Sequence, residues 1–147
     1  MNISDILSED MVLVDVEAEN KRQLLDKVAA FIAKKKSLDK NMVFDALYER
    51  ENLGSTGYGN GVAFPHARIE GIEKMVTVFV RLNHGLDYDA FDNKSVDLVS
   101  FLISPEKSGE DHLQALAAFS RPLKNSEICR SVRQAKSAHE IYVALQK

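Results

Sequence analysis

The sequence predicts an α/β protein in which one mixed β-sheet is flanked by helices on both sides. Segments rich in β-branched residues alternate along the chain with segments of helical spacing, which is typical of layered α/β domains. The segment Val96–Ile103 is apolar at nearly every position, as expected of a central strand buried on both faces. A run of helical segments then closes the chain. We find no repeat or linker, and we therefore expect a single layered domain over residues 1–147.

The first half of the chain predicts one strand and two capped helices. Val12–Val16 alternates in the manner of a strand, and Asn20 can cap the following helix, with Gln23 completing a capping box. Asp39 can cap the second helix, which ends at Leu53-Gly54. Apolar side chains recur at helical spacing in both helices: Leu24, Leu25, Val28, Ala29, Phe31 and Ile32, then Val43, Ala46 and Leu47.

The second half predicts further strands and then three helices. Val62–Phe64 reads as a short strand that Pro65 terminates or confines to a sheet edge, and Met75–Leu82 reads as a longer strand. Ser108 offers an N-cap for a helix that Pro122 bends or ends. We expect Leu113, Leu116, Ala117 and Phe119 on its inner side. The remaining helices begin at Ser126 and at Ser137, where Glu140 completes a second capping box.

The composition is that of an ordinary globular protein and excludes several classes of function. The formal net charge of −3 does not favour nucleic acid as a partner. No apolar run approaches the roughly 20 residues of a membrane span, and the acidic start lacks the layout of a secretory signal. The lone Cys129 excludes an internal disulfide framework. We expect a cytoplasmic protein without membrane insertion.

The segment Gly54–His66, GSTGYGNGVAFPH, is the strongest functional signal in the chain. Its glycines leave backbone N–H groups free to converge on an anion. We predict a phosphate-binding loop with six members: Ser55, Thr56, Gly57, Gly59, Asn60 and Gly61. The spacing fails the dinucleotide fingerprint, and no Gly-Lys-Ser or Gly-Lys-Thr is present, so a nucleotide is not expected. The alternative is a turn-rich connection without a ligand.

Three side chains are candidates for chemistry beside this loop. The ring of His66 is largely uncharged near neutral pH and can attack and carry a phosphoryl group, although a plain surface histidine is the alternative. Arg50 lies on the apolar side of its helix, just before the loop. Its guanidinium either extends to solvent or binds phosphate in bidentate fashion.

His112 is the third candidate, placed at the end of the first turn of the helix that Ser108 caps. A helix N-terminus lowers the pKa of a nearby imidazole, and a stripe shared with Leu116 and Phe119 turns His112 inward. A hydrogen-bonded core histidine is the alternative. The spacing of His66, His84 and His112 matches no metal-ligand pattern, so we predict neither a metal nor a cofactor.

Residues Ser55–His66 closely resemble the active-site signature of type-2 enzyme IIA domains of the bacterial phosphoenolpyruvate-dependent phosphotransferase system. That family includes fructose/mannitol and nitrogen-related branches. The resemblance extends to Glu49–Glu51, to Leu86–Asn93 and to His112-Leu113, and so covers most of the chain. It implies a mixed sheet with helices on both sides and a phosphotransferase that carries phosphate covalently on a histidine.

The resemblance also implies roles for individual residues. His66 is the phosphoryl acceptor through Nε2, His112 the second active-site histidine, and Arg50 the arginine near the phosphate. Ala67 stands where the family usually has glycine, and Arg68 where lysine is common. These departures affect the geometry of the loop and leave the chemistry unchanged.

The implied donor is an HPr-like phosphocarrier protein, and the implied acceptors are regulatory target proteins. The sequence carries no permease and reaches Lys147 within its last helix, which favours the nitrogen-related regulatory branch. The alternative is a free-standing fructose- or mannitol-type component that passes phosphate to a IIB domain. A third hypothesis is a binding module that keeps His66 only for packing, and the joint presence of Arg50, His66 and His112 argues against it.

Overall fold

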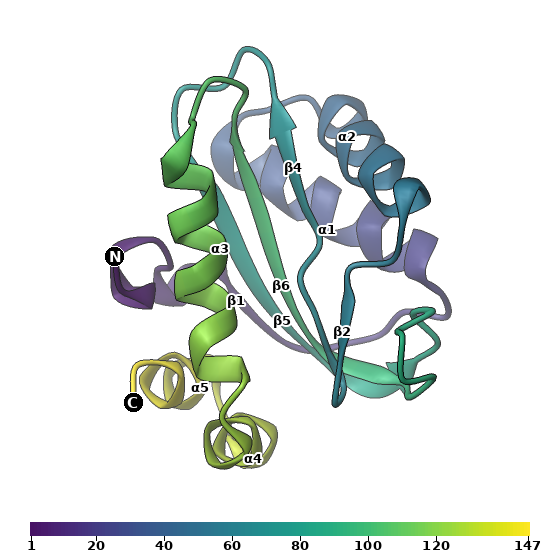
Figure 1. Cartoon of the computed structure of the whole chain (residues 1–147), viewed down its shortest axis with the longest axis vertical. Helices are drawn as coiled ribbons and strands as arrows, with labels where there is room; N and C mark the ends of the chain where they lie inside the picture. The colour runs from purple at the N-terminus through teal and green to yellow at the C-terminus, as the bar shows by residue number, and fades with distance from the viewer.

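The computed structural model describes residues 1–147 and contains a six-stranded mixed sheet with helices on both faces, which confirms the predicted fold class (Figure 1). The strands are β1 (Val12–Val16), β2 (Gly57–Gly59), β3 (Val62–Ala63), β4 (His66–Ile69), β5 (Val76–Leu86) and β6 (Val96–Pro105). The helices are α1 (Lys21–Lys36), α2 (Lys40–Leu53), α3 (Glu110–Leu123), α4 (Ser126–Gln134) and α5 (Ala138–Leu145), with short 3₁₀ helices η1 (Ile3–Asp5) and η2 (Glu9–Met11).

The sheet is built around β6. The strand order is β1-β5-β6-β3-β2, and β4 pairs with β6 further along the same side as β3. The β5–β6 and β2–β3 pairs are antiparallel and the others are parallel, which makes the sheet mixed. Every residue of β6 except Asp97 and Pro105 is buried, so the prediction of a central strand is confirmed.

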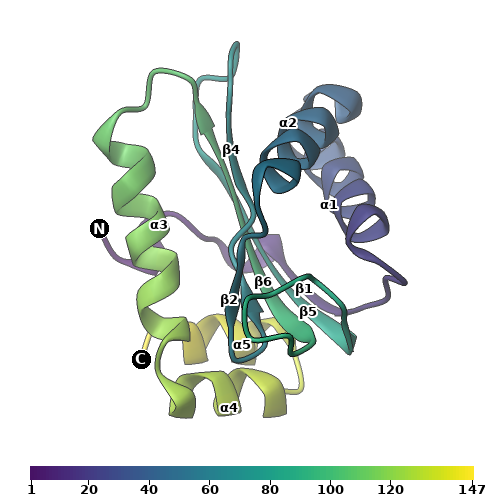
Figure 2. The same cartoon turned by 45° about the vertical axis from the view of Figure 1, so that its right-hand side comes forward.

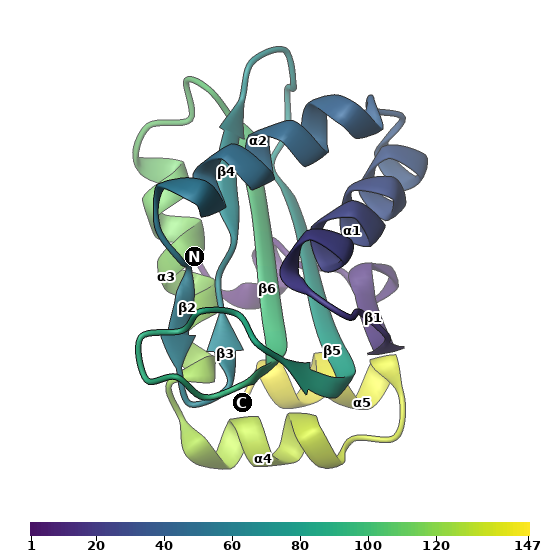
Figure 3. The same ribbon diagram turned by 90° about the vertical axis from the view of Figure 1, so that its right-hand side faces the viewer.

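The helices form layers on either side of the sheet. Helices α1 and α2 cover one face and α3 covers the other, and Figure 2 shows the strands between them. Helices α4 and α5 lie across one end of the sheet, as Figure 3 shows. None of the helices combines the length and the hydropathy that a membrane crossing requires.

The strand around Pro65 differs from the prediction. β3 ends at Ala63, and pairing with β6 resumes directly after Pro65 in β4, where His66 lies opposite Leu102. A proline lacks only the donor, and the carbonyl of Pro65 still accepts from the backbone N–H of Leu102 at 3.0 Å. His66 is therefore the first residue of an edge strand that runs on to Ile69.

Helix α3 also differs from the prediction at its start and in its inner face. Gly109, with φ at 56°, is the N-cap in place of Ser108, and no side chain caps the helix. The buried positions are His112, Ala115, Ala118, Phe119 and Leu123. Ala117 is exposed and Leu113 is 61% exposed, so the predicted stripe was about one residue, or roughly 100° of rotation, away from the observed one. The prediction followed side-chain size, whereas the packed face includes two alanines.

The predicted caps of the other helices are confirmed. The side chains of Asn20, Asp39 and Ser137 accept the backbone N–H groups of Gln23, Met42 and Glu140. Helix α4 begins at Ser126 as predicted, with the side chain of Asn125 as its cap. These local bonds set the start of four helices and leave the packing of each helix to its apolar face.

Candidate active site

His66 lies half-buried at the start of β4, and its backbone neighbourhood fixes its tautomer. The Nδ1 atom is 2.8 Å from the backbone carbonyl oxygen of Phe64. A carbonyl oxygen can only accept, so Nδ1 carries the proton and Nε2 keeps its lone pair. The ring is thus held with its nucleophilic nitrogen on the side away from the backbone.

His112 faces His66 from the first turn of α3. The two ring centroids are 5.5 Å apart and the ring planes are inclined by 58°. His112 is only 4% exposed, and its Nδ1 is hydrogen-bonded to the hydroxyl of Ser104 on β6. A buried imidazole of this kind is rigidly placed, and its other nitrogen, Nε2, has no hydrogen bond within the protein.

A pocket of about 540 Å³ lies where α2, β4 and α3 meet, and it brings the three predicted catalytic side chains together. Ten residues line it: Ala46, Glu49, Arg50, Leu53, His66, Ala67, Arg68, His112, Leu113 and Leu116. Arg50 donates through Nη1 to the carbonyl of Gly54 at 2.9 Å, which anchors one edge of its guanidinium. Leu53 and Leu113 are 85% and 61% exposed on the rim. The result is a pocket that holds two arginines and one glutamate and has an apolar rim.

The surroundings of both histidines keep their rings neutral. The pKa of His66 is lowered mainly by burial, and the nearby charge of Arg50 lowers it further. The hydrogen bond to the Phe64 carbonyl raises it, but by less than burial lowers it. Burial, Arg68 and His66 together lower the pKa of His112 to about 4. At neutral pH the pocket therefore holds two uncharged imidazoles, together with the guanidinium groups of Arg50 and Arg68 and the carboxylate of Glu49.

Most of the glycine segment lies away from this pocket. None of Gly57, Gly59, Asn60 and Gly61 lines it. Gly57–Gly59 is a strand, and Asn60-Gly61 is the two-residue turn that joins it to β3. Both turn residues have positive φ, 56° and 83°, as an Asn-Gly hairpin requires. Val62, directly after this turn, lies opposite Leu98 of β6, whereas His66 lies opposite Leu102.

Three amide groups of the segment are already hydrogen-bonded to side chains within the protein. The N–H of Thr56 donates to Glu51 at 3.0 Å, that of Gly57 to the Ser55 hydroxyl at 3.1 Å, and that of Asn60 to Asp92 at 2.9 Å. Glu51 is 5% exposed and also contacts Lys21 at 2.9 Å and the Thr56 hydroxyl. Ser55 and Thr56 thereby fix the course of the chain between α2 and β2.

Comparison with known proteins places this geometry in a family. The family model described as phosphoenolpyruvate-dependent sugar phosphotransferase system, EIIA 2, matches residues 5–147. The chain belongs to this type-2 EIIA family.

Its relatives include both regulatory and sugar-specific members. The nitrogen regulatory protein of Bradyrhizobium diazoefficiens is 37% identical over 145 residues, covering 99% of this chain and 95% of the relative. The crystal structure of the nitrogen regulatory protein IIA-Ntr from Neisseria meningitidis is 33% identical, with a TM-score of 0.91 over 97% of this chain and 98% of that one. A fructose-specific EIIA component from Haloferax volcanii is 37% identical over 103 residues, 70% of this chain and 67% of the relative.

The sequence did not predict a role for two residues of this EIIA site: Arg68, which lines the pocket, and Ser104, which lies behind His112. Arg68 lies two residues after His66, and strand alternation puts both side chains on the same face of β4. A strand that continued past Pro65 would have predicted this. Ser104 reaches His112 from β6, and no local signal could have found it, because the pair depends on how α3 packs on the sheet.

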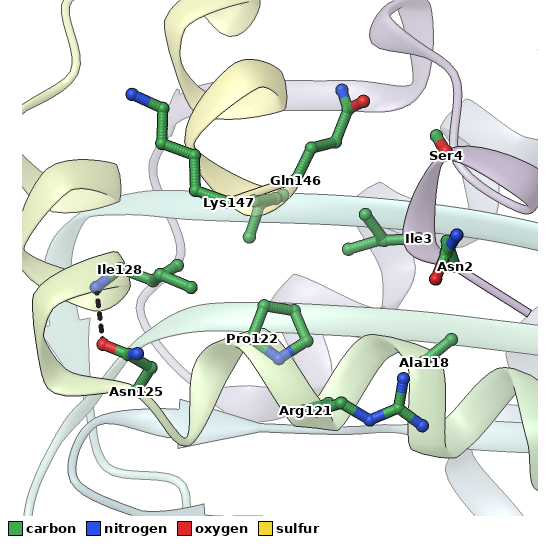
Figure 4. Close-up of a pocket in the computed structure, with 11 residues that line it drawn as sticks. Asn2, Ile3, Ser4, Ala118, Arg121, Pro122, Asn125, Ile128, Gln146 and Lys147 are labelled. Carbon is green, nitrogen blue, oxygen red and sulfur yellow. Dashed lines mark hydrogen bonds between the residues drawn. The ribbon is translucent and has the colours of Figure 1, made fainter.

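A second pocket of the EIIA fold lies at the far end of α3, between η1, α3, α4 and α5 (Figure 4). Arg121 and Pro122 line it from α3, and Asn125 lines it from the cap of α4, where its side chain accepts the Ile128 N–H at 3.2 Å. It contains none of the predicted site residues. No group of three metal-ligating side chains is placed anywhere in the structure to hold a metal ion.

Proposed function

We propose that this EIIA protein is a phosphohistidine carrier that accepts a phosphoryl group on Nε2 of His66 from an HPr-like phosphocarrier. The observation that carries the proposal is the hydrogen bond from Nδ1 of His66 to the Phe64 carbonyl. It leaves a neutral Nε2 lone pair at a pocket that also holds His112, Arg50 and Arg68. Membership of the phosphotransferase family supports the same chemistry.

The transfer is an in-line exchange between two imidazoles. Nε2 of His66 forms the new N–P bond as the P–N bond to the carrier's histidine breaks. The carrier's ring, protonated on its other nitrogen, leaves as neutral imidazole, and the ring of His66 takes up the positive charge. The Phe64 carbonyl stabilises that charge at Nδ1–H. Protons and charge balance without a metal or a nucleotide.

The pocket supplies stabilisation for the phosphoryl oxygens. Arg50 keeps guanidinium N–H groups beyond the one bonded to Gly54, and we assign them to the phosphoryl group. Arg68 adds a second positive charge from β4, and neutral His112 adds a hydrogen-bond donor. We assign no phosphate contact to Gly57, Gly59, Asn60 or Gly61, because they lie outside the pocket.

We further propose that the protein is a nitrogen-related regulator acting in the cytoplasm, whose phosphorylation state controls target proteins. Two nitrogen regulatory relatives match over nearly their whole lengths, 95% and 98%. The second candidate is a sugar-specific component that passes phosphate to a IIB domain. The fructose-specific relative, equally identical over a shorter region, favours that candidate.

The carrier function is tested by labelling with radioactive phosphoenolpyruvate through enzyme I and an HPr-like carrier. We expect the His66→Ala variant to take up no label, because the attacking nitrogen is gone. His84→Ala is the matched control, since His84 is exposed on β5 outside the pocket, and it should label like the wild type. Undiminished labelling of the His66→Ala variant would reject the proposal.

The branch is tested by comparing donors and acceptors in the same relay. A regulator should take label faster from the nitrogen-branch HPr-like protein than from the sugar-branch carrier, and should not pass it to a fructose or mannitol IIB domain. If the protein instead passes label to such a IIB domain as fast as it takes label from its carrier, it belongs to the sugar branch.

A further inference from the structure

Ser104 lies on β6, fully buried, and reaches the active-site pocket only through its hydrogen bond to His112. It is 0% exposed and pairs across the sheet with Arg68, so its side chain lies on the same face as those of Arg68 and His66. Its hydroxyl is hydrogen-bonded to Nδ1 of His112, and this is its only hydrogen bond. The contact joins the central strand of the sheet to the first turn of α3.

The direction of this hydrogen bond follows from what each group can satisfy. If Nδ1 of His112 donated, the hydroxyl hydrogen of Ser104 would be left buried without an acceptor, which costs about 1–3 kcal/mol. If the hydroxyl donates, its hydrogen is satisfied and the proton of the neutral imidazole must be on Nε2. The buried position of Ser104 therefore selects one tautomer of His112.

We infer that Ser104 is a positioning residue that holds His112 with its proton on Nε2, so that this N–H donates to the phosphoryl group on His66. The inference rests on the proposed function of His66 and assigns the source of one stabilising hydrogen bond. A tautomer with an unprotonated Nε2 would instead aim a lone pair at the phosphoryl oxygens and repel them.

The two rings of the pocket are thus set in opposite tautomers, one by the connection between β3 and β4 and the other by β6. The Phe64 carbonyl places the proton of His66 on Nδ1 and frees Nε2 to attack. The Ser104 hydroxyl places the proton of His112 on Nε2 and makes that nitrogen a donor. With the ring centroids 5.5 Å apart, the nucleophile and the donor face one pocket.

The tautomer is measured directly by ¹⁵N-edited NMR of the histidine rings in the unphosphorylated protein at pH 7. We expect the Nε2–H form for His112 in the wild type and a mixture of both forms in Ser104→Ala. Ser100→Ala is the matched control, because Ser100 is also buried on β6, two residues before Leu102, but its hydroxyl has no partner. It should keep the wild-type spectrum of His112. A wild-type spectrum with the proton on Nδ1 overturns the inference.

The consequence for transfer is measured by a double-mutant cycle with the labelling relay. Loss of one oriented hydrogen bond should slow labelling of Ser104→Ala by about fivefold to tenfold. In the His112→Ala background the same substitution should have no further effect, because Ser104 acts on the phosphoryl group only through His112. An equal slowing in both backgrounds, or an unchanged rate in Ser104→Ala, overturns the inference.

The outcomes separate this inference from the proposed function. If the wild type takes up no label, or His66→Ala still does, the carrier proposal fails while the tautomer of His112 is still read from the spectrum. If His66→Ala loses all label and the tautomer is the wrong one, the carrier function stands and the role of Ser104 fails.

Discussion

The glycine end and the histidine end of the segment Gly54–His66 are adjacent in sequence but differ in how their polar groups are satisfied. At the glycine end, Arg133 binds Asp97 through two N–H groups at 2.9 and 2.8 Å and donates to the carbonyl of Asn60 at 3.1 Å. At the histidine end, Nε2 of His66 and Nε2 of His112 have no partner within the protein.

The difference supports a division of the motif into a structural glycine end and a histidine end that we propose takes part in transfer. Bonds of this kind stabilise a hairpin and occupy polar groups that a ligand would otherwise use. Polar groups that face a pocket without partners are available to an anion. The glycines thus shape the turn that returns the chain to the sheet, and the pocket around His66 keeps polar groups for the phosphoryl group that we propose it accepts.

The largest effect on labelling should come from replacing Arg50, the arginine at the histidine end, with alanine. Arg50→Ala should slow labelling of His66 by about 10²–10³-fold, because it removes preorganised donors from the phosphoryl group. The free energy of unfolding should change by less than about 0.5 kcal/mol, since the side chain makes one bond to Gly54. Initial labelling rates and urea denaturation give the two values.

Arg133→Ala is the matched control for the Arg50 variant and should behave in the opposite way. It breaks the paired bonds to Asp97 and should lower stability while the folded fraction labels at the wild-type rate. A comparable loss of labelling in both variants would mean that the two ends are not functionally separate.

A smaller effect is expected from Gly61→Ala, which strains the hairpin. Gly61 has φ at 83°, and an added Cβ would lie 2.5 Å from Nη2 of Arg133. The left-handed backbone and the displaced arginine should together lower the free energy of unfolding by about 2 kcal/mol. Urea denaturation measures this loss, and labelling per folded molecule should be unchanged. If folded Gly61→Ala labels tenfold more slowly, the glycine end takes part in transfer.

The pH dependence of stability should report the histidine end. The pKa of His112 is about 4 in the folded protein, and the unfolded value is near 6.5, so the unfolded chain binds more protons between these limits. The contribution of His112 to the free energy of unfolding is then fully present above pH 7. It falls by on the order of 2 kcal/mol as the pH drops to 5. Denaturation at the two pH values should show this loss for the wild type and less of it for His112→Gln. An equal loss in both would assign the effect to other groups.

Much of this protein could be predicted from local signals. The caps at Asn20, Asp39 and Ser137 depend on side chains bonding to amides within a few residues, so their sequence spacing is enough. The buried central strand was predictable because both of its faces are apolar. His66, Arg50 and His112 were selected by the chemistry of their side chains, and the structure places all three at one pocket.

The tertiary structure decided what depends on contacts between distant segments. The strand past Pro65 exists because β6 offers it a partner, and the inner face of α3 is chosen by packing on the sheet. The same packing brings Ser104 to His112 and separates the glycine turn from the pocket. A sequence pattern records periodicity and side-chain chemistry, whereas the distance between two segments is set only when their surfaces are buried against each other.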